Sequence, residues 1–188
     1  MNGASADALP VDVWLAIATI LLCVALSAFF SASETALTAA SRARMHTLEK
    51  NGDRRAALVN RLLASRARLI GTALLGNTLV NIGASAVMTS ILVALAGARG
   101  ALYATGLMTV LLLVFAEVMP KTVAINYPDR TSLLVARMIS FFVAIFGPVL
   151  IGVEALVRGF LKVVGVDTSR RQSILSGHEE LKSAVDLL

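Results

Sequence analysis

Apolar residues fall in long runs without charge along this 188-residue chain, and the charged residues collect between those runs. Three runs are long, and the longest has 30 residues. They are Val13–Ser33, Leu69–Ala98 and Gly100–Ala116. A helix of about 20 apolar residues crosses a bilayer core of roughly 30 Å. The pattern therefore predicts an all-α membrane protein with three transmembrane helices, over about residues 11–40, 69–97 and 100–126.

A fourth apolar run, Met138–Val153, is shorter and contains Gly147 and Pro148. Basic residues flank this run on both sides, which favours a segment near the cytoplasmic face. We therefore expect an interrupted segment that lies at that face or enters and leaves from it. A full fourth crossing is the alternative.

Composition and charge support the membrane class and predict an orientation. Hydrophobic residues make up 57% of the chain and charged residues 15%, more apolar surface than a soluble protein of this size could bury. Residues 41–68 hold eight Lys and Arg against two acids, so this loop is predicted to be cytoplasmic, with residues 1–10 outside the cell and the C-terminus inside. Basic cytoplasmic loops are ordinary in membrane proteins, so the charge does not indicate a nucleic-acid partner.

Within this loop, Asn51-Gly52-Asp53 predicts a turn. The following segment, Arg54–Arg66, places apolar residues on one helical face and arginines on another. This pattern predicts a short helix that lies on the membrane surface or packs beneath the bundle.

Polar residues interrupt the first predicted span in the stretch LSAFFSASETAL, residues 26–37. Ser27, Ser31, Glu34 and Thr38 share one face of a helix, because positions four, seven and eleven residues apart align. Serines in membrane helices often bond back to their own backbone, and this alternative explains any single serine. It explains an acid near lipid less well.

The second predicted span contains GNTLVNIG, residues 76–83, within apolar sequence. A straight helix of 30 residues would be about 45 Å long, which exceeds one crossing. We therefore expect a break near Gly76 and Asn77, of the kind that lines a binding site at membrane depth. Asn77 and Asn81 would share a face. The alternative is that these residues only mediate helix packing.

The third predicted span ends in FAEVMPKTVAIN, residues 115–126. Proline has no N–H, so Pro120 would leave the carbonyl of Ala116 without its usual donor, beside Glu117. Lys121 follows Glu117 by four residues, so a simple ion pair at the membrane edge is the alternative.

The candidate ligands of these three stretches are all oxygens. Both histidines, His46 and His178, lie outside the predicted spans, and the single cysteine, Cys23, belongs to no polar motif. Oxygen ligands suit a hard cation such as Mg²⁺, Ca²⁺ or Na⁺ rather than zinc or copper. The spans contain no pair of nucleophile and base, so we do not expect an enzyme.

At these motifs the sequence resembles the CorC / cyclin M (CNNM) family of magnesium transport proteins. The stretches SAFFSASETALTA, LLGNTLVNI and AEVMPKTVA are similar to the family's three signature stretches, in the same order. The resemblance implies a homodimer in the plasma membrane, with a transmembrane domain over residues 11–166 and a cytoplasmic-side belt helix over residues 130–164. It also implies Mg²⁺ export coupled to Na⁺ entry. The implied ion site consists of Ser27, Ser31, Gly76, Asn77 and Glu117.

Further positions are candidates for the ion path rather than for the site. They are Asn81, Glu34, Ala116, Pro120 and Lys121. Residues 167–188 are expected to begin a cytoplasmic linker helix that continues toward a paired CBS domain, which binds ATP in family members and is absent from this chain. A natural tail helix is the alternative for these residues. A Mg²⁺-binding membrane sensor or scaffold that modulates another transporter is the alternative function, because binding and transport need the same ligands.

Overall fold

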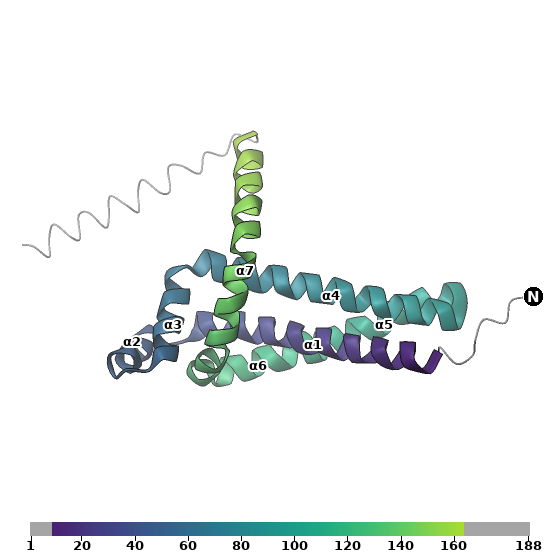
Figure 1. Cartoon of the computed structure of the whole chain (residues 1–188), viewed down its shortest axis with the longest axis horizontal. Coiled ribbons are helices and arrows are strands. Elements are labelled where there is room, and N and C mark those ends of the chain that lie inside the picture. Colours follow the sequence, from purple (N-terminus) through teal and green to yellow (C-terminus); the bar gives the residue numbers. More distant parts are fainter. Residues whose placement is uncertain (1–8, 164–188) are drawn as a thin grey trace, which may run out of the picture. The chain divides into compact units, whose positions relative to one another are not determined.

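A computed structural model describes residues 9–163 of the chain, and within this range every long element is a helix. A loop with two short helices connects the first long helix to the second (Figure 1). The elements in chain order are α1 (Leu9–Ala39), α2 (Arg42–Lys50), α3 (Arg54–Ala64), α4 (Arg66–Ala96), the 3₁₀ turn η1 (Gly97–Arg99), α5 (Gly100–Leu111), the π-helix η2 (Leu112–Val118), α6 (Met119–Asn126) and α7 (Pro128–Val163). The predicted all-α fold is confirmed.

Three segments are long and apolar enough to cross a membrane: Val13–Ala39, Arg66–Asn126 and Pro128–Leu161. The second of these folds back on itself at η1, where Gly97 has a φ of 60° and the chain reverses direction. It therefore contains both the second and the third predicted spans, and α4 and α5 lie side by side (Figure 1). Helix α1 carries the first polar stretch and packs against α4, η2 and α6, which carry the other two.

Helix α4 contradicts the predicted break near Gly76, because it runs without interruption from Arg66 to Ala96. Gly76 is buried where α1 crosses closely, and a Cβ atom at this position would collide with the ring of Phe30. Gly76 therefore allows α1 and α4 to pack closely, and the backbone of α4 stays helical at this residue. The predicted break rested on the length of the apolar run, which exceeds one crossing. A helix longer than the bilayer core can instead tilt or extend beyond the core. The first turn of α4 contains two exposed arginines, Arg66 and Arg68, as expected of an end that lies outside the core.

Residues 9–145 form one compact unit, and residues from Phe146 onward belong to a second. In the first unit, the beginning of α7 buries Ser132, Val135, Ala136 and Ile139, which recur at helical spacing. One turn further, the ring of Phe142 packs edge-on against Phe30 of α1, with the centroids 4.9 Å apart. Aromatic contact thus holds the first part of α7 to α1.

The predicted interruption at Gly147 and Pro148 is also wrong, since α7 is assigned as helix through both residues. Pro148 has no N–H to donate to the carbonyl of Ala144, a loss that single prolines in long apolar helices tolerate. The cytoplasmic location of this belt remains a prediction.

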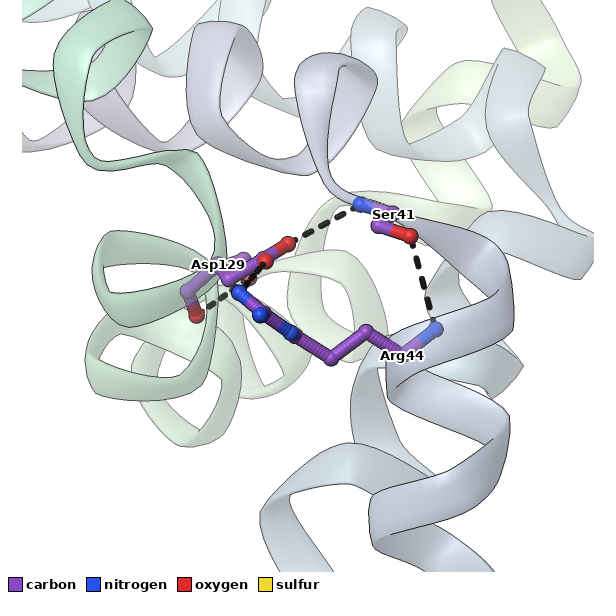
Figure 2. A network of polar contacts seen from close by, with 4 residues as sticks. Ser41, Arg44 and Asp129 are labelled. Carbon is purple, nitrogen blue, oxygen red and sulfur yellow. Dashed lines mark hydrogen bonds and ion pairs between the residues drawn. The ribbon is translucent and has the colours of Figure 1, made fainter.

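A polar contact joins the end of α1 to the start of α7 (Figure 2). Asp129 accepts a hydrogen bond from the Ser41 N–H at 2.9 Å and forms an ion pair with Arg44 at 2.8 Å. The Ser41 hydroxyl in turn accepts from the Arg44 N–H at 3.4 Å and caps α2. These contacts fix the connection where three elements meet.

The turn at Asn51-Gly52-Asp53 and the amphipathic helix after it are confirmed. Gly52 has a φ of 91°, a conformation that favours glycine. Helix α3 follows and buries Ala56, Val59, Leu62 and Leu63 on one face.

Candidate ion site at the α1–α4 contact

The first two polar motifs meet at Ser27 and Asn77. Ser27 is fully buried on α1, and its hydroxyl donates a hydrogen bond to the Asn77 side-chain oxygen on α4. The Asn81 side-chain amide approaches the same oxygen at 3.5 Å, one turn along α4. Asn77 and Asn81 therefore share a face, as their spacing predicts. The contact brings together oxygens that are 50 residues apart in the sequence.

Ser31 lies one turn after Ser27 on α1, and its hydroxyl oxygen is buried without a hydrogen-bond partner. The hydroxyl of Thr72 on α4 is likewise buried and unpartnered. Helices α1 and α4 are antiparallel, and the pairs Ser27–Asn77 and Phe30–Gly76 set their register. This register places Thr72 within about one turn of Ser31. Buried oxygens without partners are rare in proteins and often mark positions that bind water or an ion.

Thr72 was not among the residues predicted from sequence. Its signal is its spacing, because a residue four positions before Gly76 lies on the same face of α4. The side-chain oxygen of Asn81 is also buried and unpartnered. Three buried side-chain oxygens, those of Ser31, Thr72 and Asn81, are thus free to accept a hydrogen bond or to coordinate an ion. They lie on either side of the Ser27–Asn77 contact along the helices.

The remaining polar residues of the first motif behave differently. The Ser33 hydroxyl donates to the Phe29 carbonyl at 2.7 Å, and the Thr38 hydroxyl donates to the Glu34 carbonyl at 2.8 Å. The alternative of bonding back to the helix therefore explains these two residues. Glu34 is half-buried, and Thr38 is exposed. The predicted stripe consists of two buried serines followed by a more accessible end.

Glu117 lies in the π-helix η2, where the Met119 N–H donates to the carbonyl of Val114, five residues earlier. Single-turn π segments occur frequently at functional sites, because they shift side chains relative to a regular helix. The sequence indicated a disturbance here through Pro120, the second residue after η2, but it did not indicate the type of helix. Glu117 itself is half-buried.

The alternative of an ion pair between Glu117 and Lys121 is not observed: among the side chains that the structure describes, these two form no salt bridge, and Lys121 is exposed. Ala116 is fully buried and belongs to the same apolar cluster as Val24, one turn before Ser27. Ala116 thus packs η2 beside α1, and among the described side chains no hydrogen bond or ion pair joins Glu117 to Ser27 or Asn77.

The chemistry of this site is that of neutral oxygens with one acid nearby. Within the described range, no three side chains of His, Cys, Asp and Glu gather where they could hold a metal. Hydroxyl and amide oxygens on α1 and α4, with the carboxylate of Glu117 on the neighbouring element η2, match the preferences of a hard cation. The predicted ligands Ser27, Gly76 and Asn77 meet at one helix contact, and Ser31 adjoins it.

These features define a class: an all-helical membrane domain with a polar contact buried between its long helices. The chain matches the family model for the cyclin M transmembrane N-terminal domain over residues 17–188. It is 34% identical to a UPF0053 protein of Haemophilus influenzae over 179 residues, and 37% identical to the UPF0053 inner membrane protein YfjD of Escherichia coli over 160 residues. The chain belongs to the CNNM family, and the predicted resemblance is confirmed.

The alignments cover most of this chain but less than half of each relative. The alignments include 95% and 85% of this chain but only 42% and 37% of the two relatives. A DUF21 domain-containing chloroplastic protein of Arabidopsis thaliana is 36% identical over 142 residues, which is 75% of this chain and 21% of that protein. The chain thus spans less than half the length of these relatives.

Proposed function

We propose that this domain carries Mg²⁺ across the plasma membrane, by export coupled to Na⁺ entry, with alternating access around an ion held by Ser27, Ser31, Asn77 and Glu117. The observation that carries the proposal is the buried Ser27–Asn77 contact beside the unpartnered hydroxyl of Ser31. A polar group buried in a membrane helix without a partner is unfavourable, so it is retained where it has a function.

The donor set supports a divalent cation bound mostly by neutral groups. One carboxylate leaves a Mg²⁺ ion with a net positive charge, so hydroxyl and amide oxygens would supply the other protein ligands. Mg²⁺ gives up its water reluctantly, and it is usually held by few protein ligands with several waters retained. A site with one acid and several neutral oxygens suits such a partly hydrated ion.

One feature favours movement of the ion through the site rather than permanent binding: the polar stripe of α1 continues from the buried serines to a more accessible end. Glu34 and Thr38 lie one to two turns beyond Ser31 and are more accessible. We assign them, with Pro120 and Lys121, to the lining of an inward path; Ala116, also a candidate from the sequence, is instead buried in the apolar cluster.

We also propose that the domain works as a homodimer with its N-terminus outside the cell and its C-terminus in the cytoplasm. The basic loop supports this orientation through the positive-inside rule. Where such a membrane domain is joined to a paired CBS domain, as the family resemblance implies, we propose that the CBS domain binds ATP and regulates it.

The deciding experiment is a flux assay in liposomes. Purified protein is reconstituted with a Mg²⁺ indicator inside, and flux is measured with and without an opposing Na⁺ gradient. We expect Mg²⁺ flux that increases with the gradient and is lost in the E117Q variant. Tight Mg²⁺ binding without flux would instead support the sensor or scaffold function.

A further inference from the structure

A second site is suggested by a cleft of about 720 Å³ between α3 and the first part of α7. Four arginines line it: Arg54, Arg55, Arg61 and Arg137. Its other walls are apolar and come mainly from Leu58, Leu133 and Leu134. A volume of this size is typical of sites for small molecules. The cleft shares no residue with the candidate ion site.

The charge of the cleft is largely uncompensated. Arg55 pairs with Asp53 at 3.3 Å, on the turn before α3. The other three arginines form no ion pair with any acid in the described part of the chain, and no acid lines the cleft. Guanidinium groups bind phosphate groups through two parallel hydrogen bonds, so several free arginines around one cleft favour a phosphate-containing ligand.

The apolar wall distinguishes between kinds of phosphate ligand. Leu134 lies beside the arginines, and 79% of its surface is exposed. A free phosphate or a nucleotide would pair with the arginines and leave this leucine uncovered. A phospholipid would satisfy both parts, because its acyl chain can cover the leucines while its phosphate meets the guanidinium groups.

The orientation of α3 agrees with a lipid ligand. Its apolar face is buried against the protein through residues such as Val59 and Leu63, and its arginines lie on the opposite, exposed face. A short helix with one buried apolar face and a basic outer face is typical of the membrane surface, where anionic headgroups concentrate.

We propose that this cleft binds one anionic phospholipid, with its phosphate held by Arg54, Arg61 and Arg137 and the upper part of an acyl chain against Leu58, Leu133 and Leu134. The proposal requires the chain to be in a membrane, which its family establishes, and it does not require ion transport. The bound lipid would contact both α3 and the start of α7 and so hold the two helices together.

Native mass spectrometry of the full chain in detergent tests this proposal. The protein is titrated with dioleoyl phosphatidylglycerol and, separately, with dioleoyl phosphatidylcholine, which has the same acyl chains and a neutral headgroup. We expect one phosphatidylglycerol to be retained at concentrations where phosphatidylcholine is not. Glycerol phosphate, which lacks acyl chains, forms a third arm and should neither bind comparably nor displace the lipid.

Substitutions of residues that line the cleft test whether the lipid binds there. In the double variant R61Q/R137Q, phosphatidylglycerol should bind at least about tenfold more weakly, since each arginine near a membrane surface contributes appreciably to anionic lipid binding. The matched control is R99Q, because Arg99 is an exposed arginine on η1 and lies outside the cleft. The L134N variant should weaken lipid binding without changing binding of glycerol phosphate.

Equal retention of the two lipids would overturn the proposal, and so would unchanged phosphatidylglycerol binding in R61Q/R137Q. Displacement of the lipid by glycerol phosphate at similar concentration would assign the arginines to a soluble phosphate compound instead. The comparison of headgroups uses the unmodified protein, so it stands even where a variant folds poorly.

Discussion

The Ser27 hydroxyl of α1 donates a hydrogen bond to the side-chain oxygen of Asn77 on α4, at a position where Ser27 is fully buried. This bond sets the register of the two helices and uses the Ser27 proton and one lone pair of the Asn77 oxygen. The Ser27 oxygen keeps its own lone pairs, and the Asn77 oxygen keeps a second one, so both remain able to coordinate a cation. Ser27 therefore combines a structural role, through its proton, with the role of a candidate ligand, through its oxygen.

Replacing Ser27 by alanine should separate these two roles. We expect the S27A variant to lose about 1 kcal/mol of stability, the usual contribution of one hydrogen bond. Its affinity for Mg²⁺ should fall at least about tenfold, as for other changes around a bound metal. Thermal unfolding with and without Mg²⁺ measures both, because a ligand that binds the folded state raises the melting temperature.

Ser33 provides the matched control for this test, since it is equally buried on α1 but bonds to its own helix at the Phe29 carbonyl. The S33A variant should retain Mg²⁺ protection. Equal loss of protection in both variants would indicate a general disturbance of α1 and remove Ser27 from the site.

The second prediction concerns Glu117 in the π-helix. The E117Q variant should lose Mg²⁺-dependent protection, because the amide keeps the shape of the side chain but removes its negative charge. Isothermal titration in detergent measures the affinity directly. The control is E154Q, since Glu154 on α7 is an exposed acid that pairs at 4.0 Å with Arg158. Unaltered affinity in E117Q would exclude Glu117 as a ligand.

Gly76 tests the close contact of α1 and α4. A Cβ atom at this position would collide with the Phe30 ring, which is 2% exposed and has little room to move. The G76A variant should therefore be destabilised by about 1–3 kcal/mol, the typical effect of overpacking. The drop in melting temperature without Mg²⁺ measures this effect.

Gly83 offers a control on the same helix, because a Cβ atom there would meet nothing within 4 Å. The G83A variant should be neutral or slightly stabilised, since alanine favours helices by about 1 kcal/mol over glycine. The double variant F30L/G76A should recover part of the lost stability. A neutral G76A variant would show that the helices can separate at this point.

The sequence predicted the long apolar helices of α1, α4 and α5 because charge-free runs of sufficient length leave few alternatives to membrane helices. It also predicted that Asn77 and Asn81 share a face, since helical phase depends only on spacing.

The sequence did not predict that α7 is also continuous and long enough to cross, because Gly147 and Pro148 indicated an interruption. The break near Gly76 was wrong because the argument used length alone and could not include Phe30, which explains the glycine by packing. Thr72 was missed for a related reason: its hydroxyl gains meaning only from the register that tertiary contacts set between α1 and α4.

The last prediction concerns pH and the start of α3. The pKa of Asp53 lies below its ordinary value of 3.8, first because its carboxylate accepts a hydrogen bond from the Arg55 N–H and then because it bonds to the Arg55 side chain. A lowered pKa in the folded state means that the ionised cap stabilises α3 above the unfolded pKa. This contribution disappears as the pH falls through the folded value. We therefore expect α3 to loosen in acid, below about pH 4.

Hydrogen exchange at the first amides of α3 measures this effect, with the D53N variant as the reference. Asparagine also caps helices but does not ionise in this range. After correction for the intrinsic exchange rate, D53N should therefore lack the part of the pH-dependent change that comes from Asp53. The native chain should lose protection relative to D53N as the pH is lowered from about 5 to about 3. Parallel behaviour of the two chains would show that ionisation of Asp53 does not stabilise α3. Glu49 of α2 also titrates and accepts a hydrogen bond from the Asn60 amide of α3, but it is present in both chains, so its effect cancels in the comparison.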